Sequence, residues 1–211
     1  MIVLSSKGPF IKTAFCFDFD GTITSEEILP LLARELSIYE EIQALTDATI
    51  KGIIPFKRSF LLRCRLLSEV PISRVREIVH SVSLNDEIVD FIKNRQHNSF
   101  VVTGNLDVWV NQVINEKLGC EVFSSSADVI GDKLGTITHV LNKGVAVKSL
   151  RNQFERLVAI GDGMGDIQMF EECDLNIAFG GVHKPIETLI KSAHIVTYSQ
   201  EGLCKALKML S

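Results

Sequence analysis

The sequence lacks the features that mark membrane, secreted and nucleic-acid-binding proteins. Its apolar runs are far shorter than the roughly 20 residues that a membrane-spanning helix needs. Residues 1–12 hold no long apolar segment of the kind found in secretion signals. The net charge is -4, and no stretch is basic enough to follow a nucleic-acid backbone. We therefore expect a cytoplasmic protein with no membrane partner and no nucleic-acid partner.

The cysteines follow no pairing or metal-binding pattern. They are five in number, and none forms a CxxC pair: Cys16, Cys64, Cys120, Cys173 and Cys204. This argues against a disulfide framework and a zinc site, and it fits a reducing compartment. The chain also has no internal repeats and no low-complexity segments. With 211 residues, of which 46% are hydrophobic, it can bury the core of one α/β domain with a small insert, but not of two full domains.

Short apolar segments that end in glycine or acidic residues alternate with helical patterns. We predict core strands at residues 13–18, 99–103, 157–160, 176–179 and 194–197, and a β-hairpin at 127–141. Helices are predicted at 86–95, 144–154 and 107–118, the last ended by Gly119. This alternation predicts the α/β fold class, with a doubly wound parallel sheet as a Rossmann-like core and helices on both faces.

A long helical stretch without strand signals separates the first two strands. Within it, apolar residues recur every three or four positions and mark one stripe of a helix between Pro55 and Pro71: Phe56, Phe60, Cys64 and Leu67. We therefore expect a small all-helical cap at residues 26–83, inserted after the first strand. The α/β core would then be discontinuous, made of residues 1–25 and 84–211.

The segment FDFDGT places two carboxylates, Asp18 and Asp20, at the end of the first strand. At positions i and i+2 of an extended chain both would share one side, where they repel each other unless a cation lies between them. Magnesium prefers oxygen ligands in such open acidic sites. An EF-hand calcium loop does not fit, because that pattern needs glycine at its sixth position and Gly21 is fourth from Asp18.

Three further polar segments stand at element ends. GDGMGD follows a strand and brings Asp162 and Asp166, but it lacks the GxGxxG of a dinucleotide site. TGN, residues 103–105, ends another strand, and its hydroxyl and amides suit a phosphate oxygen. Lys143 stands before Gly144 at a helix start. Because ligands bind beyond the carboxyl ends of parallel strands, we expect the side chains at these strand ends to converge.

These four segments, in this order and at this spacing, resemble the four motifs of the haloacid dehalogenase superfamily. The resemblance implies a phosphatase in which Asp18 is the nucleophile and Asp20 the general acid and base. It implies Mg²⁺ as the cofactor, held by Asp18, Asp162 and the backbone carbonyl of Asp20, with Asp166 supporting the metal ligands. The second carboxyl, Asp20, favours a phosphatase over a dehalogenase, since the leaving oxygen of a phosphate ester needs a proton.

The same resemblance implies the residues that bind phosphate and substrate. Thr103, Gly104 and Lys143 would hold the phosphoryl group, with Lys148 as a second candidate for the lysine. Within the superfamily the chain is most similar to phosphoserine phosphatases, which carry a glutamate, a phenylalanine and an arginine in the cap for the substrate's ammonium and carboxylate groups. The matching residues are Glu27, Phe56 and Arg63.

Other interpretations of the cap residues stay open. Thr24 and Glu27 also fit a helix capping box, and Arg63 could belong to a solvated helix face together with Arg58 and Arg65. Helical spacing nevertheless places Arg63 beside the apolar stripe and the other two arginines opposite it.

Two departures from the phosphoserine phosphatase pattern leave the substrate open. That pattern has two glycines after the small residue of the second motif, where this chain has Gly104 and Asn105, and an asparagine where it has Gly165. Asn105 would lie against the substrate. We expect a small phosphorylated metabolite as the partner: O-phosphoserine, or alternatively phosphohomoserine, phosphoethanolamine or a sulfur-salvage intermediate. A non-catalytic binding protein on the same fold is the competing hypothesis, and the sequence leaves the oligomeric state open.

Overall fold

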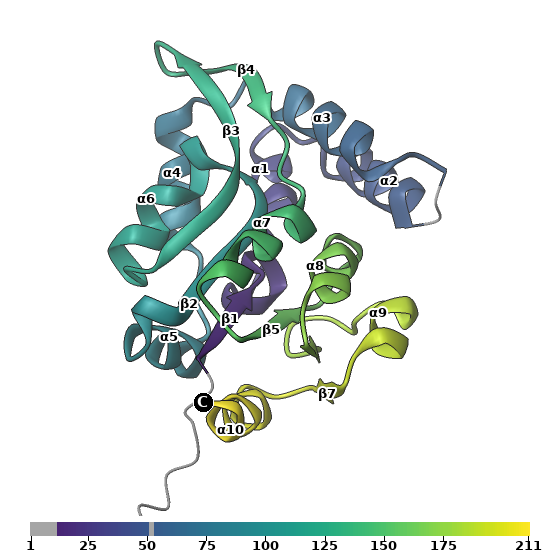
Figure 1. The fold of residues 1–211 in the computed structure, drawn as a ribbon. Coiled ribbons are helices and arrows are strands. Elements are labelled where there is room, and N and C mark those ends of the chain that lie inside the picture. The colour runs from purple at the N-terminus through teal and green to yellow at the C-terminus, as the bar shows by residue number, and fades with distance from the viewer. Residues whose placement is uncertain (1–11, 51–52) are drawn as a thin grey trace, which may run out of the picture.

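The computed structural model describes residues 12–50 and 53–211 and contains one seven-stranded sheet in the order β4-β3-β2-β1-β5-β6-β7 (Figure 1). The predicted absence of a secretion signal concerns residues that, apart from Lys12, lie outside this described part. Neighbouring strands are parallel except β3 and β4. The strands are β1 (Thr13–Phe17), β2 (Ser99–Leu106), β3 (Glu121–Ile130), β4 (Lys133–His139), β5 (Arg156–Gly161), β6 (Leu175–Phe179) and β7 (Ile195–Thr197).

Helices cover both faces of the sheet, which confirms the predicted doubly wound fold. Phe15 and Phe17 of β1 pack in one buried cluster, and the alternate residues Ala14 and Cys16 pack in another on the opposite face. The first cluster includes residues of α5 (Asp86–Lys93), α6 (Asp107–Lys117) and α10 (Gln200–Leu210). The second includes residues of α7 (Lys143–Ser149), α8 (Ile167–Glu172) and α9 (Glu187–Ser192).

The predicted strands and helices are found with shifted ends, and β3 shows the largest shift. β3 begins at Glu121, six residues before the predicted hairpin start at 127. Its first half pairs in parallel with β2, and its second half turns into the antiparallel hairpin with β4. The first half of β3, EVFSSS, is mostly only partly buried and has no run of apolar residues. Its sequence therefore does not indicate a core strand. Gly119 ends α6 with a φ of 67°, as predicted.

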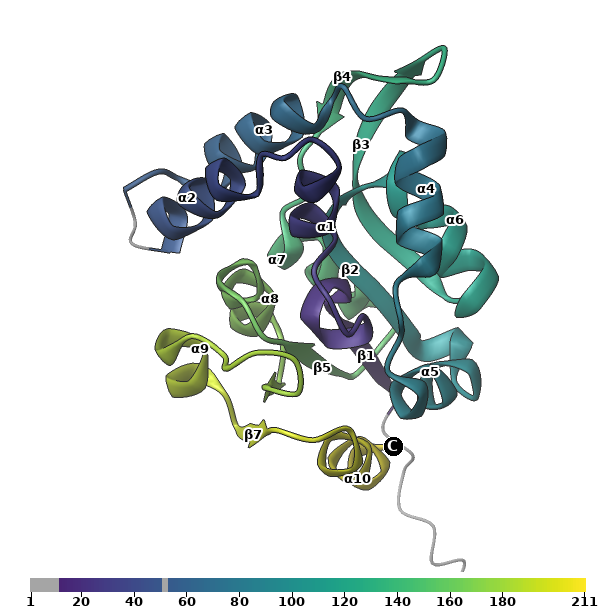
Figure 2. The ribbon, with the colours of Figure 1, turned by 180° about the vertical axis from the view of Figure 1, so that it is seen from behind.

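The predicted insert at residues 26–83 contains four α-helices in its described part: α1 (Ile28–Glu35), α2 (Tyr39–Ile50), α3 (Phe56–Leu67) and α4 (Ile72–Ser81). Pro55 and Pro71 stand immediately before α3 and α4. In the α3 stripe, Phe60, Cys64 and Leu67 are buried. Figure 2 shows α4 alongside the core helix α6, away from α2 and α3. The division into a cap at 26–83 and a core at 1–25 and 84–211 therefore stays a prediction.

The tip of the β3–β4 hairpin caps the start of α4. Asp132 accepts hydrogen bonds through Oδ1 from the backbone N–H of Ser73 (2.8 Å) and through Oδ2 from the Ser73 hydroxyl (2.6 Å). Its backbone carbonyl accepts from the N–H of Ile72 at 2.9 Å. N–H groups in the first turn of a helix have no partner within the helix, so Asp132 satisfies two of them from a distant part of the chain.

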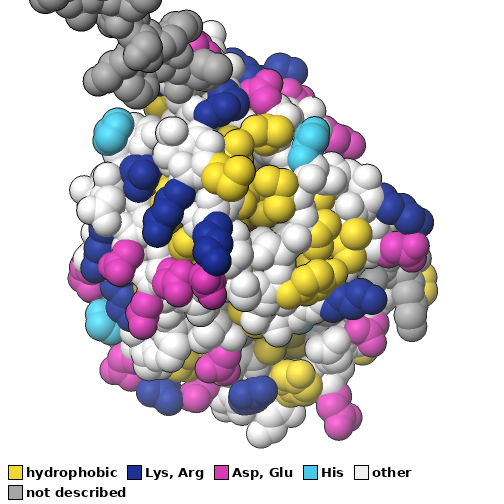
Figure 3. Space-filling view, turned by 90° about the horizontal axis from the view of Figure 1, so that it is seen from below, with side chains coloured by type: hydrophobic (Ala, Val, Ile, Leu, Met, Phe, Trp, Pro, Cys, Tyr) yellow, Lys and Arg dark blue, Asp and Glu magenta, His cyan; other side chains and the backbone are white. Residues whose placement is uncertain are grey.

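The surface and the cysteines agree with the composition. Figure 3 shows the face that includes α10, where side chains of both charges surround hydrophobic groups that gather toward one side. In the described ranges, no helix combines the length and the apolar character needed to cross a bilayer. All five cysteines are free thiols. The cytoplasmic location inferred from the cysteine pattern stays a prediction.

The Asp132 cap yields a prediction about stability. Asp132→Ala should lower the free energy of unfolding, because the N–H and the hydroxyl of Ser73 lose their partner, while the backbone carbonyl still accepts from Ile72. The Ser73 hydrogen bonds hold the pKa of the Asp132 carboxyl below its ordinary value. Its stabilising effect is therefore present above that ordinary value and is lost as the pH falls through the lowered pKa of the folded state. Urea unfolding of wild type and variant at neutral and acidic pH measures this difference.

The control is Asp128→Ala on the same hairpin, because Asp128 is exposed and has no hydrogen bond or ion pair through its side chain within residues 12–50 and 53–211. That variant should unfold like the wild type. Equal destabilisation by both substitutions, or a stability gap for Asp132→Ala that persists at acidic pH, would contradict the capping role.

Candidate active site

The carboxyl end of β1 carries Asp18 into a tight helical turn, residues 19–23. Gly21 lies in this turn with a φ of 68°, a conformation that favours glycine. A Cβ at Gly21 would also come within 2.9 Å of a carboxylate oxygen of Asp162. β1 lies between β2 and β5, so Asp18 stands at the middle of the sheet's carboxyl edge.

A buried lysine neutralises this edge. The Nζ of Lys143 donates to Asp18 Oδ1 at 2.5 Å and to Asp166 Oδ1 at 2.7 Å, and the Lys143 side chain is only 8% exposed. Burial alone would lower the pKa of Lys143, but the carboxylates of Asp166 and Asp18 outweigh that effect and raise it. Lys148, the second candidate, is 67% exposed and lies 3.4 Å from Glu172. The geometry therefore selects Lys143.

Glycine after Lys143 has a packing reason. A Cβ on Gly144 would lie 2.7 Å from the backbone carbonyl oxygen of Gln168 in α8. Glycine thus lets the start of α7 approach α8 closely and brings the lysine over the sheet edge.

Asp166 organises the loop after β5. Its Oδ2 accepts from the backbone N–H groups of Asp162 and Gly163, each at 3.0 Å, while its Oδ1 accepts from Lys143. Asp166 is completely buried. Both of its oxygens are therefore engaged, which suits a residue that holds Asp162 and Lys143 in place.

Three carboxylates meet at this point. Asp18, Asp162 and Asp166 each offer an oxygen, and these atoms lie within 4.8 Å of one another. Burial and the neighbouring Asp166 raise the pKa of Asp18, and burial raises that of Asp162. These three carboxylates are hard oxygen donors, and together they can carry more negative charge than Lys143 balances. Such a buried group fits a small divalent cation such as magnesium.

Asp20 lies in a different environment from this cluster. Its Oδ1 accepts from the backbone N–H of Ile28, the first residue of α1, at 3.2 Å. Its Oδ2 accepts from the side-chain amide of Asn105 at 2.7 Å. Burial raises the pKa of Asp20 to about 7, against the effect of the Asn105 hydrogen bond. A cation between the side chains of Asp18 and Asp20, as expected, does not match this geometry, because the turn at 19–23 directs the Asp20 side chain away from Asp18. The role of the Asp20 backbone carbonyl as a metal ligand stays a prediction.

The end of β2 supplies polar groups from Thr103, Gly104 and Asn105. Thr103 is completely buried and Asn105 is 3% exposed. The hydroxyl oxygen of Thr103 accepts from the backbone N–H of Asn105 at 3.1 Å and from its side-chain Nδ2 at 3.2 Å. The Asn105 amide therefore contacts both Thr103 and Asp20.

The insert closes the site with Arg63, Phe56 and Glu27. Arg63 is 8% exposed, and one of its terminal nitrogens donates to the Thr46 hydroxyl at 3.4 Å. Its buried Nε has no hydrogen-bond partner in the described part of the chain. The ring of Phe56 is near the backbone of Gly104 and Gly165. A buried guanidinium with free donors suits a planar anion such as a carboxylate.

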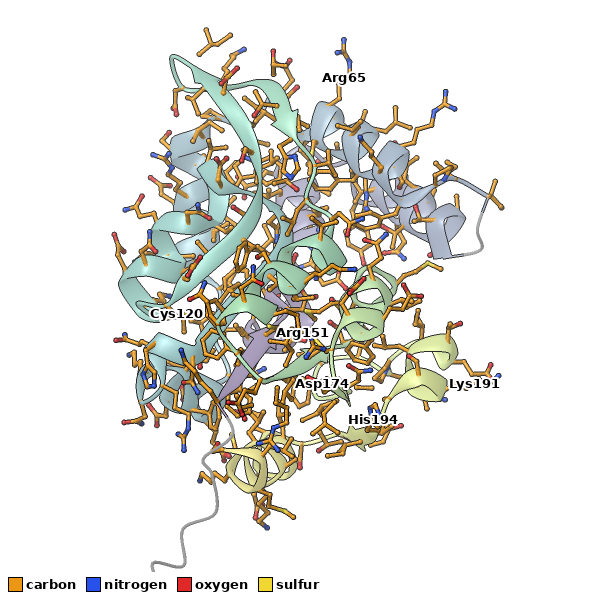
Figure 4. All side chains as sticks on the ribbon, in the orientation of Figure 1. Arg65, Cys120, Arg151, Asp174, Lys191 and His194 are labelled. Atoms are coloured by element: carbon orange, nitrogen blue, oxygen red, sulfur yellow. The ribbon has the colours of Figure 1, made fainter. Side chains whose placement is uncertain are left out.

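The predicted convergence of the strand-end residues is confirmed. One cavity of about 490 Å³ is lined by every predicted site residue: Asp18, Asp20, Glu27, Phe56, Arg63, Thr103, Gly104, Asn105, Lys143, Asp162 and Asp166. Their individual chemical roles stay predictions. Arg58 and Arg65 are exposed, as their helical spacing predicts, and Figure 4 shows Arg65 pointing outward from α3.

The structure corrects the alternative interpretation of Thr24 and Glu27. α1 begins at Ile28, after Glu27, and no side-chain cap hydrogen bond forms there. The Thr24 hydroxyl instead contacts the backbone of Phe19 and Glu26. The capping box is therefore wrong, because the turn after Asp20 engages Thr24 before the helix starts.

Sequence reasoning missed several residues that line the cavity. His183 Nε2 lies 2.5 Å from Asp162 Oδ2 and 3.8 Å from Glu27 Oε1, and the Asp162 hydrogen bond raises the pKa of His183. Lys184 follows it, and Thr46 and Thr49 come from α2. His183 stands in the loop after β6, at the same edge of the sheet, so its position beyond a strand end was the only available signal.

Comparisons with known proteins agree with this arrangement. The family model described as haloacid dehalogenase-like hydrolase matches residues 15–171. Phosphoserine phosphatase of Methanocaldococcus jannaschii is 31% identical over 80% of this chain and 85% of its own length. A solved substrate-bound phosphoserine phosphatase complex has a TM-score of 0.80 at 28% identity, covering 96% of this chain and 99% of its own. A phospho-aspartyl intermediate analogue of phosphoserine phosphatase has a TM-score of 0.77 at 30% identity, covering 94% and 98%.

Lys143 provides the test of the site's electrostatics. Lys143→Met should destabilise the fold by about 3–5 kcal/mol in excess chelator, because the buried carboxylates of Asp18 and Asp166 lose their counter-charge. Lys148→Met, at the exposed lysine five residues later, should change stability by less than about 0.5 kcal/mol. Urea unfolding at neutral pH measures both, and a similar loss in the two variants would contradict the assigned role of the buried ion pair.

Proposed function

Because the chain belongs to the family of haloacid dehalogenase-like hydrolases, we propose that it is a magnesium-dependent phosphatase that hydrolyses O-phosphoserine through a phosphorylated Asp18. One observation carries the proposal: Asp18 stands beside a buried lysine and two further carboxylates, while Asp20 is held separately in the same cavity. Such a division separates a group that must stay charged from one that must exchange a proton.

In the first step an oxygen of Asp18 attacks phosphorus, and the ester bond from phosphorus to the leaving oxygen breaks. The electron pair of that bond stays on the leaving oxygen, which takes the proton of the Asp20 carboxyl and departs as the serine hydroxyl. Lys143 and the Thr103 hydroxyl are the donors available to the negative charge of the transferring phosphoryl group.

In the second step a water molecule attacks the phosphorus of the aspartyl-phosphate. Asp20, now ionised, takes one proton of this water, and the bond between phosphorus and Asp18 breaks with its electron pair returning to the Asp18 carboxylate. Inorganic phosphate leaves, and both carboxyl groups recover their starting states. Splitting the hydrolysis into two transfers replaces one difficult step by two easier ones.

The residues present fit the metal that the family implies. Asp18 and Asp162 would bind Mg²⁺ through carboxylate oxygens, with the backbone carbonyl of Asp20 as a further ligand and Asp166 holding the loop. When bound, this ion would supply positive charge to the phosphate oxygens, and Lys143 would contact the phosphoryl group beside it.

The insert supplies the selection of substrate. The solved substrate-bound relative is a phosphoserine phosphatase, and phosphoserine carries an ammonium and a carboxylate. Arg63 offers its buried, unpaired Nε–H to the carboxylate, and Glu27 offers an acceptor to the ammonium in the same cavity. Phe56 would pack against the substrate between them, and the helices that carry these residues would act as the cap.

The nucleophile can be tested by one substitution. Asp18→Asn should lower turnover by about 10³-fold or more while the fold persists, because an amide cannot attack phosphorus. Phosphate release and circular dichroism measure the two effects. Retention of more than about a hundredth of the wild-type rate would contradict a covalent role for Asp18.

The metal site can be tested without catalysis. Magnesium should raise the melting temperature by mass action, with about 2.7 kcal/mol of stabilisation at a concentration 100 times the dissociation constant. Chelator should remove this shift and abolish activity, and calcium should restore activity poorly because its larger shell draws more ligands. Asp162→Asn is the matched variant: it should lose most of the magnesium-dependent shift. A shift of wild-type size in that variant would contradict the ligand assignment.

The substrate clamp, by which Arg63 would bind the carboxylate and Glu27 the ammonium of phosphoserine, can be tested with two arginines on opposite faces of α3. Arg63→Ala should lower kcat/KM for O-phosphoserine by about thirty-fold to several thousand-fold, because the substrate carboxylate loses its partner, and should spare an aryl phosphate that has no carboxylate. Arg65→Ala, on the outer face of α3, should leave both activities unchanged. If the two variants behave alike, or if phosphoethanolamine is hydrolysed as well as phosphoserine, the clamp is wrong and another small phosphomonoester is the substrate.

A further inference from the structure

The side-chain amide of Asn105 joins two groups of the proposed reaction. Its Nδ2 lies 2.7 Å from Asp20 Oδ2 and 3.2 Å from the hydroxyl oxygen of Thr103. An amide nitrogen carries two hydrogens, so both contacts can form at once. The side chain is buried in the wall of the cavity, and its bond to Asp20 is the shorter of the two.

The amide is itself held in one orientation. The Thr103 oxygen accepts from both the backbone N–H and the side-chain nitrogen of Asn105, which fixes the side chain against its own strand. Turning the amide over would place its oxygen against the oxygens of Asp20 and Thr103. A carboxyl oxygen can accept the Nδ2–H bond whether Asp20 is protonated or ionised.

Asp20 therefore has two supports from different parts of the chain. The Asn105 amide holds Oδ2 from β2 of the core, and the backbone N–H of Ile28 holds Oδ1 from α1 of the insert. Any movement of α1 relative to the sheet would weaken the second support and leave the first intact. Asn105 is thus the support that the sheet itself supplies, from the end of β2.

We propose that Asn105 is a positioning residue that keeps the Asp20 carboxyl in the orientation needed for both of its proton transfers, instead of binding the substrate directly. The inference rests on the proposed function, in which Asp20 protonates the leaving oxygen and later takes a proton from the attacking water. Misplacing a catalytic group by about 1 Å can cost about 10²-fold in rate.

The two proton transfers depend differently on the substrate, and this makes the role measurable. Proton donation matters for an alkoxide leaving group such as that of phosphoserine, but little for nitrophenolate, which leaves as an anion. Proton removal from water acts on the same aspartyl-phosphate whichever substrate formed it. Loss of positioning should therefore slow the first step only for the alkyl phosphate and the second step for both.

The experiment compares Asn105→Leu and Asn105→Ala with wild type on O-phosphoserine and p-nitrophenyl phosphate, with magnesium present. Both variants should lower kcat/KM for phosphoserine by about 10- to 100-fold. For p-nitrophenyl phosphate, kcat/KM should stay within about threefold, while kcat falls at least about tenfold. Rapid mixing should then show a burst of nitrophenolate close to one equivalent per enzyme, because hydrolysis of the aspartyl-phosphate has become slow.

Two sets of controls complete the design. Asn111→Ala, on α6 outside the cavity, should leave both activities unchanged. For p-nitrophenyl phosphate, Asp20→Asn should lower kcat even more than the Asn105 variants do, again with little change in kcat/KM. Adding Asn105→Leu to Asp20→Asn should cause no further loss, since Asn105 acts through Asp20. Leu keeps the bulk of Asn105 and Ala removes it, so the test can be made with either variant if the other does not fold. Normal activity in both variants, or failure of both to fold, would overturn the proposal.

The remaining outcomes separate this proposal from the proposed function. A higher KM for phosphoserine with an unchanged kcat for p-nitrophenyl phosphate and no burst would show that Asn105 binds the substrate, and would overturn positioning alone. Additive losses in the double variant would overturn it as well. Absence of phosphate release by the wild type, or full activity of Asp18→Asn, would instead overturn the phosphatase mechanism on which the inference rests.

Discussion

The buried ammonium of Lys143 is the contact on which the arrangement of the active site depends. It joins Asp18, at the end of β1, to Asp166, in the loop after β5, although these residues lie 125 and 23 positions away from it in the sequence. Without such a cation, carboxylates packed at this density would repel one another and take up protons. Gly144 permits the close approach of α7 to α8. The position of the Lys143 ammonium therefore depends on this helix packing.

The five carboxylates that line the cavity fall into three environments. Asp18, Asp162 and Asp166 form a cluster that favours cations, and Asp20 is half-buried apart from it with hydrogen bonds to both oxygens. Glu27 is exposed on the insert side. One type of functional group can therefore differ in its charge state and in the partners it binds, because burial and neighbours differ at each position.

The fold and the strand-end residues were predictable because each carries a local pattern. Apolar strands followed by Asp18, Asp162 and Thr103 indicate a parallel sheet and one functional edge, and the structure brings all three to one cavity. The polar start of β3 has no such pattern, since a partly buried strand needs no apolar run. His183 and Thr46 reach the cavity only through tertiary packing. The environment of Asp20 was also missed, because it depends on Asn105, 85 positions away in the sequence, and on the place where α1 begins, at Ile28.

The central position of β1 has a consequence for how the chain folds. The strand that carries Asp18 pairs with β2 and β5, whose partners in register for Phe15 are Ser99 and Val158. Most of the chain must therefore be synthesised before both edges of the strand TAFCF are paired. Contacts of such long range form slowly. Helices α1, α2 and α3, which pack on one another, can form much earlier. A nascent chain therefore has no complete cavity until β5 has joined the sheet, because Asp162 and Asp166 follow that strand.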